Sequence, residues 1–256
     1  LSLRSLSDSQ AALFSDRVFI GEEVERAVLA SCPGAEGVLT YLVNDLYTET
    51  SSVLYSVAVG IGPRAAKRLG VSFPARDEIV INDWLASPAL KGGLGSKTGD
   101  EIGISFFAVN SSRDFFVVGD GKTESGGLDD GDRIIFRVAG VIAQGAGALT
   151  DGWLPEFPGL ETAQTLATWE SGLPIETKRI REVDELFWDQ YKATPKAFIS
   201  LERAQELWGN RFGRLSAIHL GTRVTDEAGF VAKLREELDL KDLGISVRQL
   251  SVERRL

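Results

Sequence analysis

The sequence has no methionine and only one cysteine and one histidine, Cys32 and His219. A single thiol cannot form a disulfide within the chain. Two residues also fall short of the three or four ligands, roughly, that a Cys/His zinc site requires. Cys32 directly precedes Pro33-Gly34 at the expected end of a helix, and His219 lies in the apolar run 215–220. We therefore interpret them as a small buried thiol and a hydrogen-bonded strand histidine rather than a catalytic pair.

Basic residues and long apolar runs are also scarce. The 28 Lys and Arg side chains are outnumbered by 37 Asp and Glu, which gives a net charge of −9. A protein that binds nucleic acid needs a basic face to displace counterions from phosphate, so this balance argues against a nucleic-acid partner. No stretch approaches the roughly 18 apolar residues that span a bilayer, and the chain, which starts at Leu1, does not open with the pattern of a signal peptide. We expect a globular segment of a larger protein.

The N-terminal part predicts a strand, a helix and a hairpin. The apolar run 18–20 indicates a short strand, and acidic residues after Gly21 favour the start of a helix that ends at Pro33-Gly34. Residues 38–43 and 53–59 are rich in β-branched and aromatic side chains, which is typical of strands, and 47–52 supplies the turn.

The C-terminal part repeats this alternation of strands and helices. Ser200 is a natural N-cap, and either Thr225 or Asp226 caps a later helix. The expected strands are 198–199, 215–220 and 245–252, and the expected helices are 201–208 and the segment that follows 226. Together with the N-terminal part, this predicts an α+β fold in which a split βαβ layer is interrupted by an insertion.

The middle of the chain has a different pattern. A strand at 78–82 and a short helix at 83–90 precede three strands that suggest a small antiparallel unit, at 102–109, 115–118 and 134–142. Residues 150–192 form a long excursion rich in acidic and aromatic side chains. We therefore predict two subdomains: 1–75 together with 193–256 form the split layer, and 76–192 form a β-rich insert.

Two patterns in the middle suggest ligands but fit turns better. The glycine-rich link 92–95 lacks the spacing of a phosphate-binding loop and follows a helix instead of joining a strand to one. Acids near glycines could ligate calcium, but they do not follow the spacing of an EF-hand loop, and tight turns favour the same residues. These acids are Asp120, Asp129, Asp130 and Asp132.

The carboxylates of the excursion carry the strongest enzymatic alternative. Asp151 and Glu156, beside Trp153 and Phe157, could form an acid pair on an aromatic platform, as in an enzyme that acts on carbohydrate or peptide. Most aromatic side chains are packing residues, so we favour the interpretation that Trp153, Phe157 and Trp169 hold the excursion on the β unit. The same three aromatics are candidates for partner contact. We assign no catalytic, cofactor-binding or metal-binding residue.

A second charged row lies at the end of the excursion. We interpret it as the solvated face of a short helix whose apolar residues lie beneath it. The charged residues are Arg179, Arg181, Glu182, Asp184 and Glu185, and the apolar ones are Ile180, Val183, Phe187 and Trp188.

Several passages resemble the extracytoplasmic domain of ABC transporter permeases of the FtsX/MacB type. Residues 78–86 (EIVINDWLA) and 97–102 (KTGDEI) are similar to the family passage I-N-x-x-L-A … G-D-x-I. Residues 136–142 (FRVAGVI) are similar to its strand F-x-V-x-G-I, and 194–205 (TPKAFISLERAQ) to its passage A-F-I-P-L-x-x-A-Q. Residues 154–159 (LPEFPG) resemble a subfamily that carries the long excursion.

The resemblance implies a porter-like α+β layer split by a mostly antiparallel, sabre-like β insert, at the extracytoplasmic (periplasmic) face of the cell membrane. It also implies a role without chemistry, in which a separate cytoplasmic ABC ATPase subunit drives movement of this domain through the transmembrane helices of the same permease chain. A lipid, a lipoprotein or an extracytoplasmic protein would be the external partner, and the full permease would be a dimer. A stand-alone solute-binding or adhesion module is a further alternative. We expect hinges at 73–77 and 192–196, each of which contains a proline.

Overall fold

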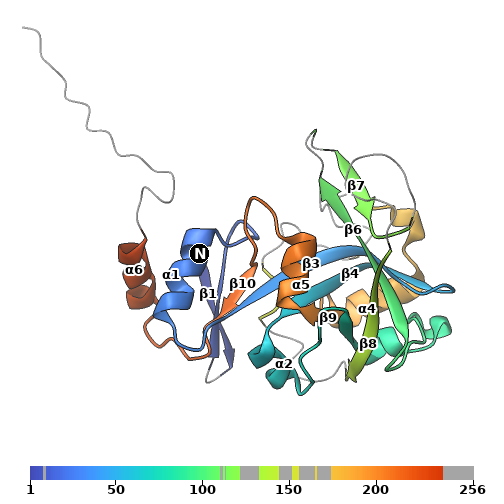
Figure 1. Ribbon diagram of the computed structural model, residues 1–256, viewed down its shortest axis with the longest axis horizontal. Coiled ribbons are helices and arrows are strands. Elements are labelled where there is room, and N and C mark those ends of the chain that lie inside the picture. The colour runs from blue at the N-terminus through green and yellow to red at the C-terminus, as the bar shows by residue number, and fades with distance from the viewer. Residues whose placement is uncertain are drawn as a thin grey trace, which may run out of the picture.

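The fold is taken from a computed structural model, which describes residues 1–7, 10–109, 112, 114–121, 133–143, 152–155, 165 and 174–238. It confirms an α+β fold, built on one mixed sheet (Figure 1). The strands are β1 (Ser2–Ser7), β2 (Gln10–Phe14), β3 (Glu36–Tyr47), β4 (Ser52–Ile61), β5 (Glu78–Asn82), β6 (Glu101–Val109), β7 (Phe115–Val118), β8 (Ile134–Ile142), β9 (Ala197–Ser200) and β10 (Ala217–His219). The α-helices are α1 (Glu22–Ser31), α2 (Pro63–Leu69), α3 (Asp83–Ala86), α4 (Glu182–Tyr191), α5 (Leu201–Trp208) and α6 (Glu227–Glu237), and 3-10 turns lie at Ala89–Lys91 and Thr177–Arg179.

Six strands close into a barrel. Their order is β3-β4-β9-β5-β8-β6, and β6 pairs with β3 to complete the ring. Most neighbours are antiparallel, but β4 pairs with β9, and β5 with β8, in parallel. Strands of the predicted insert therefore hydrogen-bond to strands of the predicted split layer at two places, β5 to β9 and β6 to β3. The division into two subdomains stays a prediction.

The barrel encloses the largest hydrophobic core, and helix α5 closes it on one side. Ala204 and Trp208 of α5 join this core together with residues of all six strands. The helix approaches β4 closely at Gly60, where an added Cβ would lie 2.2 Å from the Cβ of Ala204. A side chain larger than hydrogen at residue 60 would push α5 away, so two small residues set the distance between helix and barrel.

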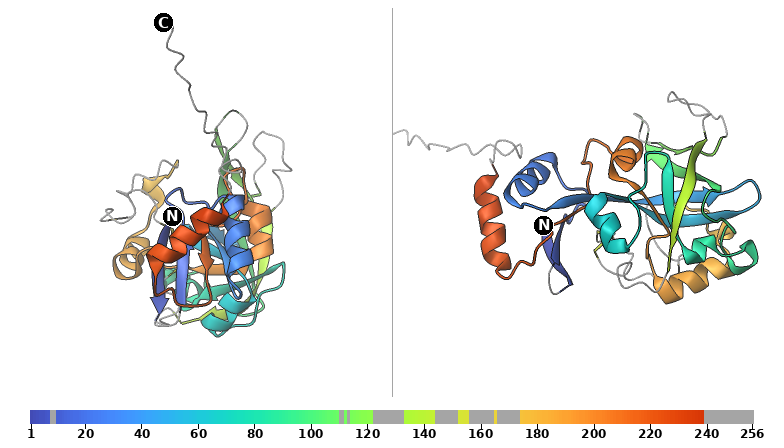
Figure 2. Two further views of the ribbon diagram at one scale, coloured as in Figure 1. Left: turned by 90° about the vertical axis from the view of Figure 1, so that its left-hand side faces the viewer. Right: turned by 60° about the horizontal axis from the view of Figure 1, so that its bottom comes forward.

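The flanking strands extend the sheet beyond the barrel. Strand β3 is 12 residues long: its first part pairs with β10, which in turn pairs with β2, and its last part pairs with β6. Helices α1 and α6 pack beside this flank, at the left of Figure 1 and apart from the barrel (also Figure 2). The molecule thus consists of the barrel and of a flank, made up of β1, β2, β10, α1 and α6, and the two parts share the long strand β3.

Most elements predicted from the sequence are present at nearly the predicted bounds, including the helix at 22–31, the strands of the middle segment and the helix at 201–208. The expected strand 245–252 lies outside the described residues. The hairpin of β1 and β2 and the helix α2 were not anticipated.

Two predicted elements are wrong. Residues 18–20 form a turn in which Val18 has a φ of 68° and only Ile20 makes an isolated bridge, to Leu215. The predicted helix 83–90 ends at Ala86, because Pro88 disfavours the helical conformation at the residue before it. The glycine link that follows packs closely against the end of α3. A Cβ at Gly93 would lie 2.2 Å from the carbonyl oxygen of Ser87, so only glycine fits at this position.

Candidate functional site at the junction of helix α4 and the barrel

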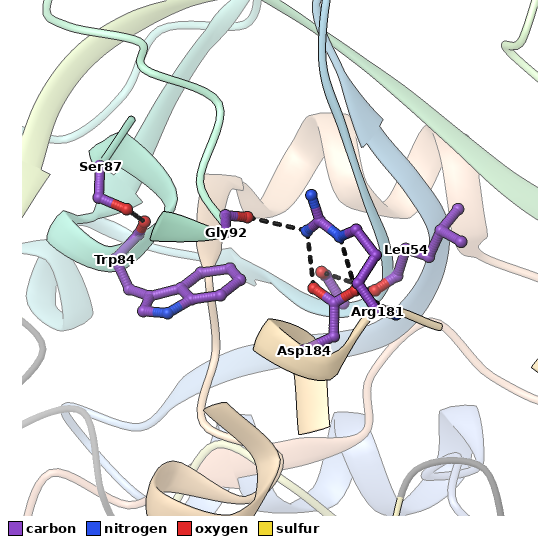
Figure 3. Close-up of polar contacts among 7 residues, drawn as sticks. Leu54, Trp84, Ser87, Gly92, Arg181 and Asp184 are labelled. Atoms are coloured by element: carbon purple, nitrogen blue, oxygen red, sulfur yellow. Dashed lines mark hydrogen bonds and ion pairs between the residues drawn. The ribbon is translucent and has the colours of Figure 1, made fainter. Parts of the chain in front are cut away.

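A buried ion pair fixes the start of helix α4. Asp184 accepts three hydrogen bonds from Arg181: from its backbone N (3.1 Å), from Nε (2.9 Å) and from Nη2 (2.7 Å). The Nη2 group also donates to the carbonyl oxygen of Gly92 at 2.8 Å, and this joins α4 to the link behind α3 (Figure 3). Asp184 is only 3% exposed. The prediction that it belongs to a solvated face is therefore wrong, whereas Phe187 and Trp188 are buried as expected.

Lys196 places a second positive charge in the same region. Its side chain is buried, and its Nζ lies 4.4 Å from the ring centroids of both Trp84 and Phe187. The ammonium thus contacts the faces of both rings. Burial lowers the pKa of Lys196 to about 8, and the nearby Asp184 carboxylate opposes this shift. The cluster therefore holds two cations and the carboxylate of Asp184, and the carboxylate of Asp45 also acts on Arg181.

The backbone of Lys196 is fixed on both sides. Its N–H donates to the carbonyl oxygen of Val57 on β4, and its own carbonyl oxygen accepts from the N–H of Asn82 on β5, both at 2.9 Å. Asn82 also caps helix α3 through a 2.7 Å bond from the N–H of Leu85. The strands of the barrel thus direct the lysine side chain between Trp84 of α3 and Phe187 of α4.

A small cavity lies beside this cluster, between β4 and α4. The space open to the centre of a water molecule is about 20 Å³, enough for a small polar group. Lys196, Asp184 and Trp188 line the cavity, and Nε1 of Trp188 is a buried donor that has no hydrogen-bond partner among the described residues. The other lining residues are Leu42, Leu54, Tyr55, Ser56, Val57, Leu154, Phe187, Lys192, Ala193 and Thr194.

The predicted hinge 192–196 connects α4 to β9 and borders the cavity. Lys192 ends the helix with a φ of 52°, a conformation that side-chain-bearing residues rarely adopt. Thr194 donates through its hydroxyl to the carbonyl oxygen of Tyr191, and Pro195 accepts from Nδ2 of Asn82 at 3.4 Å. The link thus contains strained backbone between two fixed ends.

The other predicted hinge, 73–77, is attached to its neighbours by ion pairs. Glu78 accepts from the N–H of Ala75 at 3.1 Å and from Nη2 of Arg137 on β8 at 2.8 Å. Arg76 forms an ion pair with Glu206 on α5. Movement at this link would have to break these surface ion pairs, each of which contributes about 0–1 kcal/mol to stability.

Trp153 lies in the core and is 2% exposed. Its ring packs edge-on against Phe198 and His219, and the hydroxyl of Thr40 donates to its carbonyl oxygen. Trp153 is thus a packing residue, but these contacts are with β9, β10 and β3 of the split layer and not with the β unit at 102–142 on which the sequence analysis placed it. A side chain so placed offers no surface to a partner in this conformation. Asp151, Glu156, Phe157 and Trp169 lie outside the described residues, so partner contact at Phe157 and Trp169 stays a prediction.

His219 is the hydrogen-bonded strand histidine that the sequence predicts. Its Nε2 lies 2.6 Å from the carbonyl oxygen of Gly152, and its Nδ1 is bonded to Arg68. Because Nδ1 faces a guanidinium, it accepts, and Nε2 carries the proton. Burial, together with the charge of Arg68, lowers the pKa of His219 to about 4. Cys32 ends helix α1, where it is half-buried.

The described residues contain neither a metal-binding cluster nor a membrane-spanning helix. None of their His, Cys, Asp and Glu side chains form a group of three or more that could hold a metal ion. None of their helices is long and apolar enough to cross a membrane. Of the four calcium candidates, Asp129, Asp130 and Asp132 lie outside this part of the chain.

Sequence reasoning missed Lys196 as a site residue. The available signal was a lysine directly before the apolar strand Ala197–Ser200, a position at which a charged side chain is rarely buried without a reason. For Asp184, the signal was its place three residues after Arg181, at the start of the predicted helix.

The chain matches no family model and no curated protein. Among solved structures, its fold is similar to that of the periplasmic region of MacB from Actinobacillus actinomycetemcomitans. The match covers 92% of this chain and 85% of that one, with 9% sequence identity and a TM-score of 0.41. At this level of identity the likeness concerns the fold alone.

Proposed function

We propose that this chain is the non-catalytic extracytoplasmic domain of an ABC transporter permease, and that it transmits movement from the membrane to a partner outside it. The observation that carries the proposal is the placement of the passages that resemble this family. Residues 78–86, 136–142 and 194–205 are distant in the sequence but form β5 with α3, β8, and β9 with α5. Strand β5 pairs with both β8 and β9, so the three passages form adjacent parts of one barrel.

The proposed movement is a change in how the 76–192 segment packs on the rest of the chain. The strained link after α4 and the ion-paired link before β5 are its hinges, and the cluster of Arg181, Asp184 and Lys196 defines one of two packings. A separate cytoplasmic ATPase subunit supplies the energy, and the transmembrane helices of the permease chain bias the two packings. The external partner is a lipid, a lipoprotein or a protein, and the permease acts as a dimer.

The parent protein tests the proposal directly. We expect its reading frame to contain apolar segments of about 20 residues on both sides of this chain. We also expect the protein, purified from membranes in detergent, to bring with it an ATPase whose activity falls when a disulfide joins the 76–192 segment to the flank. A matched pair of cysteines placed within the flank alone is the control. A parent protein without apolar segments, or one that purifies without an ATPase, would refute the proposal.

A further inference from the structure

Residues 174–193, here named the clasp, lie outside the sheet. They contain the 3-10 turn Thr177–Arg179 and helix α4, and none of them belongs to a strand. Strands β5, β6 and β8 of the predicted insert are hydrogen-bonded into the closed barrel, so they cannot shift without breaking main-chain bonds. The clasp, by contrast, can leave the barrel while every strand pair stays intact.

A small apolar cluster of its own holds the clasp on the barrel. Trp188 of α4 is buried there against residues of β4 and β6. The buried members are Leu54, Tyr55, Phe107 and Trp188, and the partly buried clasp residues packed against them are Ile175, Ile180 and Ala193. The larger core inside the barrel consists of other residues. Release of the clasp would therefore expose the small cluster and leave the main core in place, as in a unit that opens locally.

Tyr55 is a strained residue of β4 that contacts the clasp. Its φ is 48°, although the residue pairs on either side of it keep the regular register between β3 and β4. Successive side chains of a strand ordinarily point to opposite faces, but Leu54 and Tyr55 lie in the same cluster. The hydroxyl of Tyr55 accepts from the N–H of Glu176 in the clasp at 2.7 Å. The unusual backbone thus directs Tyr55 toward the clasp.

Lys192 is a strained residue at the other end of the clasp. Its φ of 52° and ψ of −136° form a conformation that glycine adopts readily and other residues adopt at a cost. Three described residues other than glycine have a positive φ, and two of them, Tyr55 and Lys192, line the cavity between β4 and α4. Strain of this kind persists only where the surroundings enforce it, and it is concentrated at regions that switch between conformations.

We propose that the clasp is a releasable element that opens as one unit while the barrel stays folded. In the docked state it is held by the apolar cluster, by the bond from Glu176 to Tyr55, and by the bond from Arg181 to the carbonyl oxygen of Gly92 (Figure 3). In the open state Tyr55 and Lys192 return to ordinary backbone conformations, and this relief offsets part of the docking free energy. The inference concerns the isolated chain, so it does not depend on the transporter assignment; within that assignment it names the part that moves.

Amide hydrogen exchange of the whole chain, followed by NMR, tests the clasp. We expect the amides of α4 to exchange through one common opening, with protection factors at least about 10-fold lower than those of β4 and β9. Lys192→Gly should raise the protection of α4 about 5-fold, because glycine takes the docked backbone conformation without strain. Lys67→Gly is the matched control: this lysine is exposed on α2 and has no positive φ, so the protection of α4 should not change.

Gly60→Ala separates opening of the clasp from global unfolding. It crowds α5 against β4 in the barrel, which is folded both when the clasp is docked and when it is open. We expect it to lower the protection of β9 and to leave that of α4 unchanged. In the original chain, low concentrations of urea should likewise lower the protection of β9 much more than that of α4, because local opening exposes little surface.

Three results would each overturn the proposal. The first is a Gly60→Ala variant in which the protection of α4 falls as much as that of β9. The second is a urea dependence that is equal for the two elements, which applies even if the Gly60→Ala variant does not fold. The third is a Lys192→Gly variant in which the protection of α4 does not rise.

Discussion

Replacing Lys196 with methionine should make the chain more stable at neutral pH and remove a pH dependence that the lysine imposes. Methionine has a similar length and an unbranched, adaptable side chain, so it fills the same space between Trp84 and Phe187. It carries no charge to desolvate. The effect of the substitution therefore separates the energetic cost of the ammonium from the packing of its stem.

The magnitude follows from the lowered pKa. Burial lowers the pKa of Lys196 to about 8 from its ordinary value of 10.5. Between these two values the unfolded chain keeps the proton and the folded chain loses it, so the free energy of unfolding rises with pH. From pH 7 to pH 9.5 the lysine contributes an increase of about 2 kcal/mol. The charged groups around it are Asp184 and Arg181 on α4 and Lys192 on the link, and the substitution retains all three.

The assay is urea denaturation of both proteins at pH 7 and at pH 9.5. Tyrosines with raised pKa values, such as Tyr41, also affect stability at alkaline pH, but they are common to both proteins and cancel in the difference. We expect the variant to be the more stable protein at pH 7, with a lead that shrinks by about 2 kcal/mol at pH 9.5. A lead that is the same at both pH values would refute the reasoning that the ammonium is buried and charged.

Three further predictions concern other parts of the fold. Asp184→Asn should lower the free energy of unfolding by about 3 kcal/mol in the same assay, because it breaks a buried ion pair beside Lys196. The control is Asp189→Asn: the Asp189 side chain is 87% exposed, so the free energy of unfolding should change by less than about 0.5 kcal/mol. Equal effects of the two substitutions would contradict the role of Asp184. Gly60→Ala should destabilise the chain by about 1–3 kcal/mol through overpacking against α5, and Ala204→Gly should recover part of this loss in the double variant; strictly additive losses would show that the two residues do not meet. Because burial lowers the pKa of His219 to about 4 from 6.5, stability should be complete above pH 6.5 and fall by about 3 kcal/mol as the pH approaches 4. His219→Gln should remove this decline, and a ring signal of this single histidine that titrates near pH 6.5 in the folded chain would contradict its burial.

Elements with strong local signals could be predicted from the sequence. Helix 201–208 has a serine cap and an apolar stripe, and the strands of the middle segment are β-branched runs bounded by turns. The hairpin of residues 2–14 was missed because its first strand, Ser-Leu-Arg-Ser-Leu-Ser, has few β-branched or aromatic residues and is held by pairing with β2. Closure of the barrel was also beyond prediction, because the contact of β3 with β6 joins residues about 60 positions apart.

The candidate site shows the same limit. Sequence spacing indicated a short helix over 179–188 but not that Asp184 faces its buried side, so Asp184 was predicted to lie in solvent. Its burial follows from Arg181 and from the carbonyl oxygen of Gly92, which the fold brings together across 89 residues. The environment of Lys196 likewise comes from three separate segments, and no local pattern encodes it.

The shared strand β3 has a mechanical consequence. A backbone strand that is hydrogen-bonded into the flank at one end and into the barrel at the other behaves as a stiff rod, so a tilt of either part must tilt the other or break main-chain bonds. Amide protons along its length should therefore exchange with solvent in one cooperative opening. A force applied to the flank would therefore pass to the barrel through β3 itself, without a flexible linker between the two parts.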